Sequence, residues 1–388
     1  MAKIKRLLII SILMILLMIF FLLISSCQAQ TENQSAASNQ NQNEDKGDKT
    51  EMSNQVWMSA FQPWRLDALD EWAQTGAKLD VLCVFIDDVV KATDEELNQL
   101  HDMLDKTGIK LAVECAGICN WYANLYAPGN DDFAYNSVYG EGGEFTRLKR
   151  LIDMGIKISY LNIDHGILRG TNPDDTSELK MSGKEAAEQL FTAMKYWKKE
   201  LPDIKFNYIV NFPNHGWKGE FAYNYQWDSD FFCGDFYEDF KEICRLNNEN
   251  ESGVKMNAVI ADFPYNYAIG KMSTTFLKKD FNVKNYDWVG RILDLESETK
   301  TAGMKFGLIF NCDIAGYGKN VTAEKYCTDT LKYLDLYKSK GGLPDYNISE
   351  SWYFLPDGTN IPKLLPESES YTMTNLTMEI IKKVKSED

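Results

Sequence analysis

The sequence predicts a single (β/α)8 barrel of the TIM type over residues 55–388, and three observations predict it. Short β-rich runs alternate eight times with stretches of helical periodicity, which is typical of successive βα units around a parallel sheet. Several helices end in glycine just before the next strand, as short αβ loops require. The connections after the third to the sixth strand are long, and long loops at one rim are where barrel enzymes build their sites.

The eight strands are predicted from short apolar runs bounded by turn residues. They are residues 56–64, 79–88, 109–117, 156–164, 204–212, 256–263, 305–313 and 347–356. A doubly wound open sheet is the structural alternative. It needs no eighth strand, however, and usually opens with a glycine-rich phosphate turn, which this sequence lacks.

The helices between these strands carry start and stop signals. Thr93 can cap a helix that Gly108 ends, and Ser182 can cap a second long helix. Gly155 and Gly303 likewise stand at helix ends directly before strands. These positions predict where the chain turns from each helix back into the barrel.

Residues 1–26 have the pattern of a bacterial lipoprotein signal peptide. A basic start precedes an uncharged apolar run, Leu7 to Ile24, and then Ser25-Ser26-Cys27. This pattern predicts that Cys27 is lipidated and that the protein is anchored in the cell membrane, facing outside the cytoplasm. The alternative is an uncleaved membrane anchor, because eighteen apolar residues can just span a bilayer. Residues 27–54 are polar and predict a flexible tether.

The chain is strongly acidic. Its formal charge is −16, and removal of Lys3, Lys5 and Arg6 with the signal peptide makes it −19. Such a field repels phosphate backbones and other polyanions. Nucleic acid is therefore excluded as a partner, whereas neutral carbohydrate substrates remain open.

Three cysteines, Cys83, Cys115 and Cys312, lie inside or at the ends of predicted strands. We expect them to be buried free thiols, since small apolar side chains suit such positions. No cysteine or histidine pairs stand at the spacing of a zinc site. The sequence therefore predicts no metal and no cofactor.

Carboxylates and other polar groups follow most of the strands. They are Asp87 with Asp88, Glu114, Asp164 with His165, Asn211 with Asn214 and His215, Asp262, Asn311 with Asp313, and Glu350. Because the carboxyl ends of parallel strands meet at one rim, we expect these side chains to lie together. Crowded carboxylates in a partly dry cleft raise some of their pKa values, which is typical of a functional site.

Aromatic residues share the predicted rim. They are Trp64, Trp121, Tyr122, Trp217, Tyr223, Tyr225, Trp227, Tyr265, Tyr267 and Trp352. Flat rings beside carboxylates and amides suit sugars, which have apolar faces and polar edges. The alternative is that these rings only pack the long loops onto the barrel.

With this pattern, residues 55–388 resemble the TIM-barrel glycoside hydrolases in architecture. The stretch "YLNID", Tyr160 to Asp164, is similar to the melibiase-like α-glycosidases, whose fourth strand ends in a Lys-x-Asp nucleophile. In those families the region of the sixth strand supplies an acid/base Asp. The resemblance implies these roles for Asp164 and Asp262, with Asn162 standing where the families carry Lys.

The sequence therefore predicts a cell-surface glycoside hydrolase that cleaves a neutral glycan with Asp164 and Asp262. Glu350, on the last strand, is the alternative catalytic carboxylate. The apolar run before Asp262 favours it as the protonated acid. The predicted substrate-binding residues are Trp64, Asp87, Glu114, His165, Asn211, His215, Trp217, Asn311, Asp313, Glu350 and Trp352.

Two other functions remain open. One is a tethered barrel that binds glycans without cleaving them. The other is a metal-dependent sugar isomerase or epimerase, in which Glu114, Asp164 and His215 would hold a divalent ion. The sequence predicts no oligomeric state.

Overall fold

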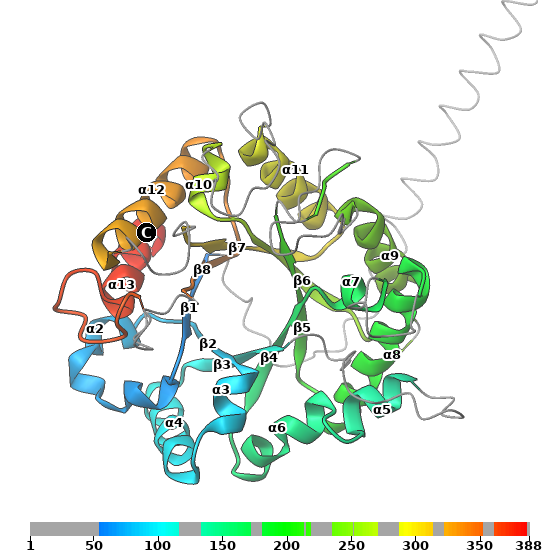
Figure 1. Cartoon of the computed structure of the whole chain (residues 1–388), viewed down its shortest axis with the longest axis horizontal. Coiled ribbons are helices and arrows are strands. Elements are labelled where there is room, and N and C mark those ends of the chain that lie inside the picture. The colour runs from blue at the N-terminus through cyan, green and yellow to red at the C-terminus, as the bar shows by residue number, and fades with distance from the viewer. Residues whose placement is uncertain are drawn as a thin grey trace, which may run out of the picture. The chain divides into compact units, whose positions relative to one another are not determined.

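The chain forms a closed barrel of eight parallel strands surrounded by helices (Figure 1). This computed structural model describes residues 54–115, 133–171, 181–212, 215–218, 235–250, 252–270, 287–312, 322–351 and 361–385. Each strand pairs with the next in sequence, and β8 closes the sheet against β1. The predicted (β/α)8 fold is confirmed.

All eight predicted strands are present. They are β1 (Gln55–Ala60), β2 (Val81–Phe85), β3 (Lys110–Cys115), β4 (Ile158–Asp164), β5 (Lys205–Asn211), β6 (Met256–Asp262), β7 (Lys305–Phe310) and β8 (Tyr346–Ser349). The predicted ranges were too long at the ends of β1, β2 and β8. Apolar residues continue past these strands into the segments that follow, so composition alone does not mark where strand pairing stops.

Helices cover the outside of the barrel (Figure 1). They are α2 (Ala73–Gly76), α3 (Ile86–Lys91), α4 (Asp94–Thr107), α5 (Phe133–Tyr139), α6 (Glu144–Asp153), α7 (Gly166–Thr171), α8 (Gly183–Glu200), α9 (Phe236–Glu249), α10 (Tyr265–Ala268), α11 (Trp288–Thr301), α12 (Ala323–Ser339) and α13 (Met373–Lys385). Two 3-10 helices, η2 (Pro63–Asp67) and η3 (Leu69–Glu71), follow β1.

The predicted helix boundaries are confirmed. Thr93 and Ser182 each form a capping box, in which the hydroxyl accepts from the third helical N–H and a glutamate reaches back to the cap. Gly108, Gly155 and Gly303 have φ values of 70°, 85° and 76°. A residue with a side chain is strained in this left-handed conformation, whereas glycine is not. Glycine at these positions therefore lets the chain leave the helix and enter the next strand.

Side chains fill the barrel interior. The rings of Trp57, Tyr160 and Tyr346 lie in contact, with centroids 4.9 Å apart for Trp57 and Tyr160 and 4.6 Å apart for Trp57 and Tyr346. All three are buried near the N-terminal ends of their strands. The barrel is therefore closed by packed aromatic rings at this end, and a site inside it must open at the opposite, C-terminal end.

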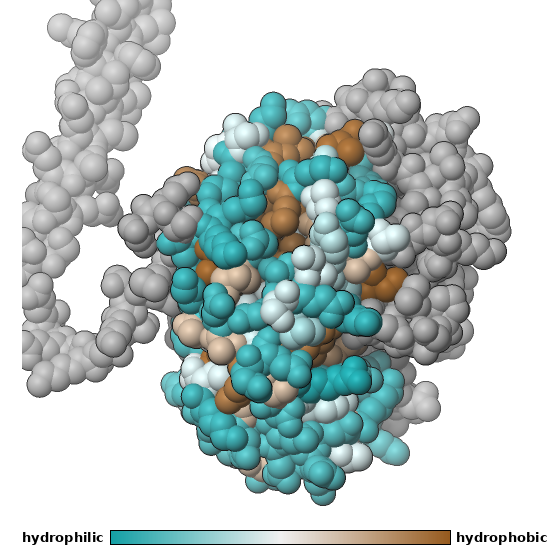
Figure 2. Space-filling model, turned by 90° about the vertical axis from the view of Figure 1, so that its left-hand side faces the viewer, coloured by the Kyte–Doolittle hydropathy of each residue, from teal (hydrophilic) through white to brown (hydrophobic). Residues whose placement is uncertain are grey.

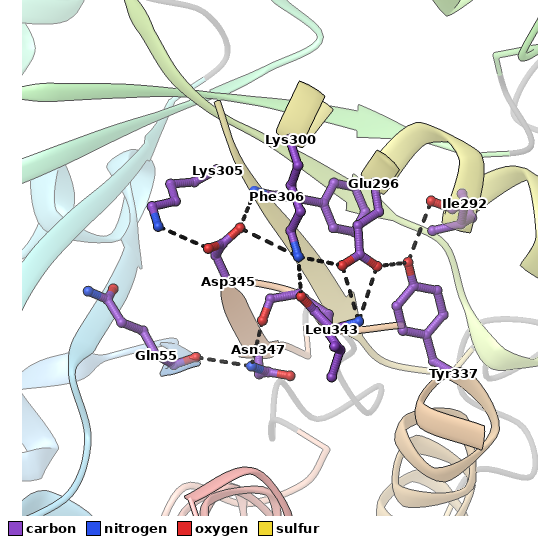
Figure 3. A network of polar contacts seen from close by, with 11 residues as sticks. Gln55, Ile292, Glu296, Lys300, Lys305, Phe306, Tyr337, Leu343, Asp345 and Asn347 are labelled. Atoms are coloured by element: carbon purple, nitrogen blue, oxygen red, sulfur yellow. Dashed lines mark hydrogen bonds and ion pairs between the residues drawn. The ribbon is translucent and has the colours of Figure 1, made fainter. Parts of the chain in front are cut away.

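A polar network joins the loops at the N-terminal ends of β7 and β8 (Figure 3). The buried Glu296 carboxylate accepts from the Tyr337 hydroxyl at 2.7 Å, from Lys300 Nζ at 2.7 Å and from the Leu343 N–H at 3.1 Å. Asp345 accepts from Lys305 at 3.0 Å. These contacts hold α11, α12 and the strand β8 together, far from the C-terminal mouth.

The outer side that carries α2, α12 and α13 is mostly hydrophilic, with scattered apolar residues (Figure 2). This distribution is typical of helices that face water. Within the described ranges no helix is long and apolar enough to cross a membrane. The predicted signal peptide and tether lie outside those ranges.

Replacement of Glu296 tests the network at the closed end. Glu296→Ala leaves the Tyr337 hydroxyl and the Leu343 N–H without their charged acceptor, so we expect a loss of about 1–3 kcal/mol in the free energy of unfolding. Urea unfolding measures it. The control Glu379→Ala, which removes an exposed ion pair with Lys382, should cost less than about 0.5 kcal/mol. Equal effects of the two changes would contradict the buried network's role.

Candidate active site at the barrel mouth

Strand alternation carries the polar side chains into the mouth. Successive side chains of a strand point to opposite faces, so the residue two places after a buried interior residue also points inward. The interior cluster is Trp57, Val81, Cys83, Ala112, Tyr160, Ile209, Ala258, Ile260, Ile309, Tyr346 and Ile348. The next inward positions toward the C-terminal rim are Ser59, Phe85, Glu114, Asn211, Asp262, Asn311 and Glu350, with Asp164 ending β4.

Asp262 lies at the centre of this mouth and is held on both carboxylate oxygens. Asn211 Nδ2 donates to Oδ2 at 2.8 Å, and Asn311 Nδ2 donates to Oδ1 at 3.0 Å. Burial raises the pKa of Asp262, and the negative charge of Asp164 adds to the rise, while the two amides oppose it. The neighbouring strands β5 and β7 thus clamp the carboxylate of β6 between them.

Glu350 lies directly after β8 and is 4% exposed. Its Oε2 accepts from the Ser59 hydroxyl at 2.8 Å. Burial raises the pKa of Glu350 to about 8, and the charges of Asp262 and Asp164 contribute to the rise. Glu350 and Asp262 are therefore a coupled buried pair in which one charge disfavours the other.

Asp164 ends β4, and the two residues after it fix its side chain. His165 Nδ1 contacts Asp164 Oδ1, and the side chain of Asp164 remains 26% exposed. His165 has a φ of 56°, a left-handed conformation that is uncommon for a side chain of this size. A Cβ on Gly166 would lie 2.6 Å from the Ile163 side chain, so only glycine fits there.

His215 packs behind this turn. Its ring stacks on that of His165 with centroids 5.3 Å apart and an interplanar angle of 18°. Burial lowers the pKa of His215 to about 3, so the ring is neutral. Its Nδ1 lies 3.1 Å from the Asn211 carbonyl oxygen, which can only accept; Nδ1 therefore donates and Nε2 is left as an acceptor.

Three buried acceptor atoms of the residues that follow β5 and β7 or end β5 have no hydrogen-bond partner in the part of the chain that the structure describes. They are Asn211 Oδ1, Asn311 Oδ1 and His215 Nε2. Their residues are 7%, 0% and 0% exposed, and an unpaired buried polar atom costs about 1–3 kcal/mol. These atoms and the carboxylates are all hydrogen-bond acceptors. A ligand that is rich in hydroxyl or amine donors would therefore complement them.

Below the mouth, Asn162 belongs to a chain of buried amides. Asn257 donates to Asn207 at 2.7 Å, Asn207 donates to Asn162 at 2.9 Å, and Asn162 donates to Cys83 Sγ at 3.4 Å. Each amide is therefore satisfied by its neighbour without any charge. A lysine at position 162 would place an ammonium group inside this chain.

Three of the predicted substrate-binding residues make contacts outside the polar cluster around Asp262. Trp64 is in η2 rather than at the end of β1, and it packs on the core between the barrel and the helices. Asp87 is in the first turn of α3, where it pairs with Arg147. Trp217 is 3% exposed and donates to Asp294 at 2.7 Å.

The placement of Trp217 follows from packing between helices. Its ring lies against Phe236, Tyr237 and Phe240 of α9, so it holds this helix rather than offering a face to a ligand.

The predicted residues Asp313 and Trp352 lie outside the described residues. The same is true of Asn214, Trp121, Tyr122, Tyr223, Tyr225, Trp227 and Cys27.

The structure adds residues that the sequence analysis missed. Ser59 binds Glu350, and Phe85 at the mouth stacks on Phe61 with ring centroids 4.3 Å apart. The signal for both was strand alternation: Ser59 follows Trp57, and Phe85 follows Cys83, at the period of two. Phe61 and Phe85 are both partly exposed, so their pair offers an aromatic surface at this rim.

The predicted burial of Cys83, Cys115 and Cys312 is confirmed. Within the described segments, no three His, Cys, Asp or Glu side chains are grouped closely enough to hold a metal ion. Glu114, Asp164 and His215, proposed as ligands under the isomerase alternative, therefore do not form such a group. His215 instead uses Nδ1 to bind the backbone.

Comparison with known proteins finds no matching family model and no matching curated protein. The chain is similar to the structure of D-psicose 3-epimerase with D-tagatose from Clostridium cellulolyticum H10, at 14% identity and a TM-score of 0.41 over 86% of this chain and 99% of that one. It is also similar to family 1 β-glucosidase from Thermotoga maritima in complex with isofagomine lactam, at 13% identity and a TM-score of 0.42. That match covers 75% of this chain and 76% of the other. A third similar structure is that of 3-keto-D-glucoside 4-epimerase from E. coli, at 8% identity and a TM-score of 0.41. That match covers 84% of this chain and 98% of the other. These likenesses concern the barrel alone.

The pH dependence of stability tests the buried state of Glu350. Because its pKa is raised in the folded protein, the folded state keeps a proton that the unfolded chain releases above about pH 4.5. The free energy of unfolding therefore falls as pH rises toward 8, by at most about 1.4 kcal/mol per pH unit from this group. Glu350→Gln removes this pH-dependent loss of stability, because Gln does not ionise.

We expect the stability of Glu350→Gln relative to the parent to be greater at pH 8 than at pH 5, as measured by urea unfolding of both proteins. Gln keeps the acceptor for Ser59, so the two proteins should be similar at pH 5. A stability difference that is the same at both pH values would show that Glu350 ionises like an exposed glutamate.

Proposed function

We propose that this protein is a glycoside hydrolase that cleaves a neutral oligosaccharide at the C-terminal mouth of its barrel. One observation carries the proposal: carboxylates of different character meet at one mouth beside buried acceptors that lack donors. Asp164 is partly exposed, whereas Asp262 and Glu350 are buried and electrostatically coupled.

Glycoside hydrolysis needs this division between carboxyl groups. One must be protonated to help the leaving oxygen depart, and the other must be ionised to attack the anomeric carbon or to activate water. Asp164 suits the ionised role because His165 pairs with it and because it remains accessible. The buried pair of Asp262 and Glu350 suits the acid, since two neighbouring carboxylates disfavour losing both protons.

The mouth also fits the surface of a sugar. Hydroxyl groups donate hydrogen bonds, and the unpartnered atoms of Asn211, Asn311 and His215 are acceptors. The partly exposed pair of Phe61 and Phe85 can stack on the apolar face of a sugar ring. The negative charge of the chain disfavours acidic glycans, which leaves neutral ones.

Loss of either proposed catalytic carboxylate should abolish turnover without unfolding the protein. Asp164→Asn and Asp262→Asn should each lower kcat by about 10²–10⁴-fold or more on a nitrophenyl glycoside that the parent cleaves. Thermal unfolding should show that both variants stay folded. The measurement is the release of nitrophenol from a panel of neutral nitrophenyl glycosides.

Asp87→Asn is the matched control, because Asp87 is also an acidic residue just after a strand but pairs with Arg147 on the outside. It should keep turnover within about twofold. If the parent bound oligosaccharides but cleaved none of the panel, the barrel would be a glycan-binding protein. If Asp164→Asn kept parental turnover, the ionised role would belong to another carboxylate.

We also propose that the protein is an exported lipoprotein tethered outside the cytoplasm. The basic start, the apolar run from Leu7 to Ile24 and the cysteine after Ser25-Ser26 support this location. An extracellular place agrees with the hydrolysis of a polymer that cannot cross the membrane. Residues 27–54 would let the barrel reach such a polymer while it stays anchored.

Replacement of the cysteine tests the anchor. Cys27→Ala should remove the lipid and release the protein from the membrane fraction, because the thiol is the predicted attachment point. The mass of the mature N-terminal peptide and membrane fractionation measure it, with Cys244→Ala as the control that keeps the lipid. Unchanged membrane attachment of Cys27→Ala would favour the uncleaved apolar anchor.

A further inference from the structure

We propose that Glu350 is the proton donor of this site and that Asp262, which the sequence favours as the acid, stays ionised throughout the reaction. The inference rests on the proposed glycoside hydrolase function and assigns the roles within the buried pair. It follows from which atoms of each carboxyl are already occupied by donors.

Both oxygens of Asp262 already accept a hydrogen bond. Asn211 donates to one oxygen at 2.8 Å, and Asn311 donates to the other at 3.0 Å. An amide NH2 group can donate but cannot accept. Hydrogen bonds to the charged form of a carboxyl group favour that form, so the two amides favour the carboxylate of Asp262 and oppose the rise in its pKa that burial causes.

Glu350 has the opposite arrangement. Among the described residues, the one side-chain hydrogen bond of Glu350 comes from the Ser59 hydroxyl to Oε2. A hydroxyl can rotate, so Ser59 can donate to the carboxylate and can accept from the carboxylic acid. Both forms of Glu350 therefore keep a hydrogen bond, as a group that gives up and regains a proton requires.

The surroundings of Glu350 also favour its protonated form. The neighbours that act on its charge are the carboxylates Asp262 and Asp164 and the Cys83 thiol, and Tyr326 binds its backbone carbonyl rather than its side chain. Burial and the charge of Asp262 raise the pKa of Glu350 well above its usual range. The ionised Asp262 thereby keeps a proton on Glu350 at neutral pH.

In the reaction, the bond between the anomeric carbon and the leaving oxygen breaks, and its electron pair goes to that oxygen. The leaving oxygen takes the proton of Glu350, which becomes a carboxylate. Over the full turnover a water molecule supplies the oxygen that bonds to the anomeric carbon. One proton of that water replaces the proton that Glu350 gave, so that the enzyme returns to its starting form.

Infrared spectroscopy tests where the proton resides and needs no substrate. The C=O stretch of a protonated carboxyl should be present in the parent at pH 7 and lost in Glu350→Gln. Asp239, whose pKa is raised to about 7 by burial, contributes a similar band. All proteins should therefore carry Asp239→Asn, so that the remaining band belongs to the mouth.

Two further variants make the infrared result decisive. In Asp262→Asn the band should persist but titrate at lower pH, because a negative charge that raises the pKa of Glu350 is gone. In Ser59→Ala it should titrate at higher pH, because the hydroxyl stabilises the carboxylate. A band that survives in Glu350→Gln and disappears in Asp262→Asn would overturn the assignment, as would the absence of a band in the parent at pH 7.

Leaving-group dependence tests the same assignment by kinetics. A dinitrophenyl group departs without protonation, so Glu350→Gln should stay within about tenfold of the parent on dinitrophenyl glycosides and fall by about 10²–10⁴-fold on the matching unactivated disaccharide. Asp262→Asn should be slow on both. The reversed pattern would make Asp262 the acid and overturn the proposal.

The two experiments separate failure of this inference from failure of the proposed function. If the parent cleaves no glycoside, the proposed function fails and Glu350 has no leaving group to protonate. The infrared spectra would then still show which carboxyl holds the proton. If the parent cleaves glycosides but Glu350→Gln shows no leaving-group dependence, only the assignment of the proton donor is wrong.

Discussion

The clamp on Asp262 is the interaction on which the rest of the mouth depends. The Asp262 carboxylate is 8% exposed, and burial of a charge costs more free energy than ordinary packing contributes unless hydrogen-bond donors stabilise that charge. The donors come from Asn211 and Asn311 on the two neighbouring strands, so the clamp exists only when β5, β6 and β7 are in register. The fold therefore creates the site, and the site in turn requires the fold.

The fixed charge of Asp262 has consequences for its neighbours. It disfavours ionisation of Glu350, whereas the side chain of Asp164 is partly exposed and contacts His165. The neutral ring of His215 stacks on that of His165. Carboxyl groups of one chemical type thus acquire different states because their partners differ, which is the usual way a single cleft supplies both an acid and a base.

Unpaired polar groups at the mouth lower the stability of the fold, and contacts at the closed end of the barrel offset this loss. The aromatic rings of Trp57, Tyr160 and Tyr346 pack the closed end, and the network around Glu296 ties the loops there. The mouth, by contrast, leaves acceptors unpaired and a glutamate with a raised pKa. Packed rings and satisfied polar groups lie at one end of the strands, and the proposed site lies at the other.

Much of this organisation could be predicted from the sequence, and the missing parts share a physical reason. The strand count and the helix boundaries follow from local signals, such as the caps at Thr93 and Ser182, and these were correct. Asp262 was placed at the mouth because strand ends converge. Trp217 was misplaced because its exposure depends on contacts with α9, which lies elsewhere in the chain. The raised pKa of Glu350 could not be predicted, since it depends on burial and on the charge of Asp262 from β6.

The most direct test of the central claim is a crystal structure of Asp164→Asn with an intact neutral oligosaccharide. The variant keeps the clamp and Glu350 but should not turn the substrate over. The account predicts that the glycosidic oxygen lies within hydrogen-bonding distance of Glu350, about 2.6–3.2 Å, and that the anomeric carbon faces residue 164. An oligosaccharide that binds with its linkage away from both residues, or outside the mouth, would contradict the account.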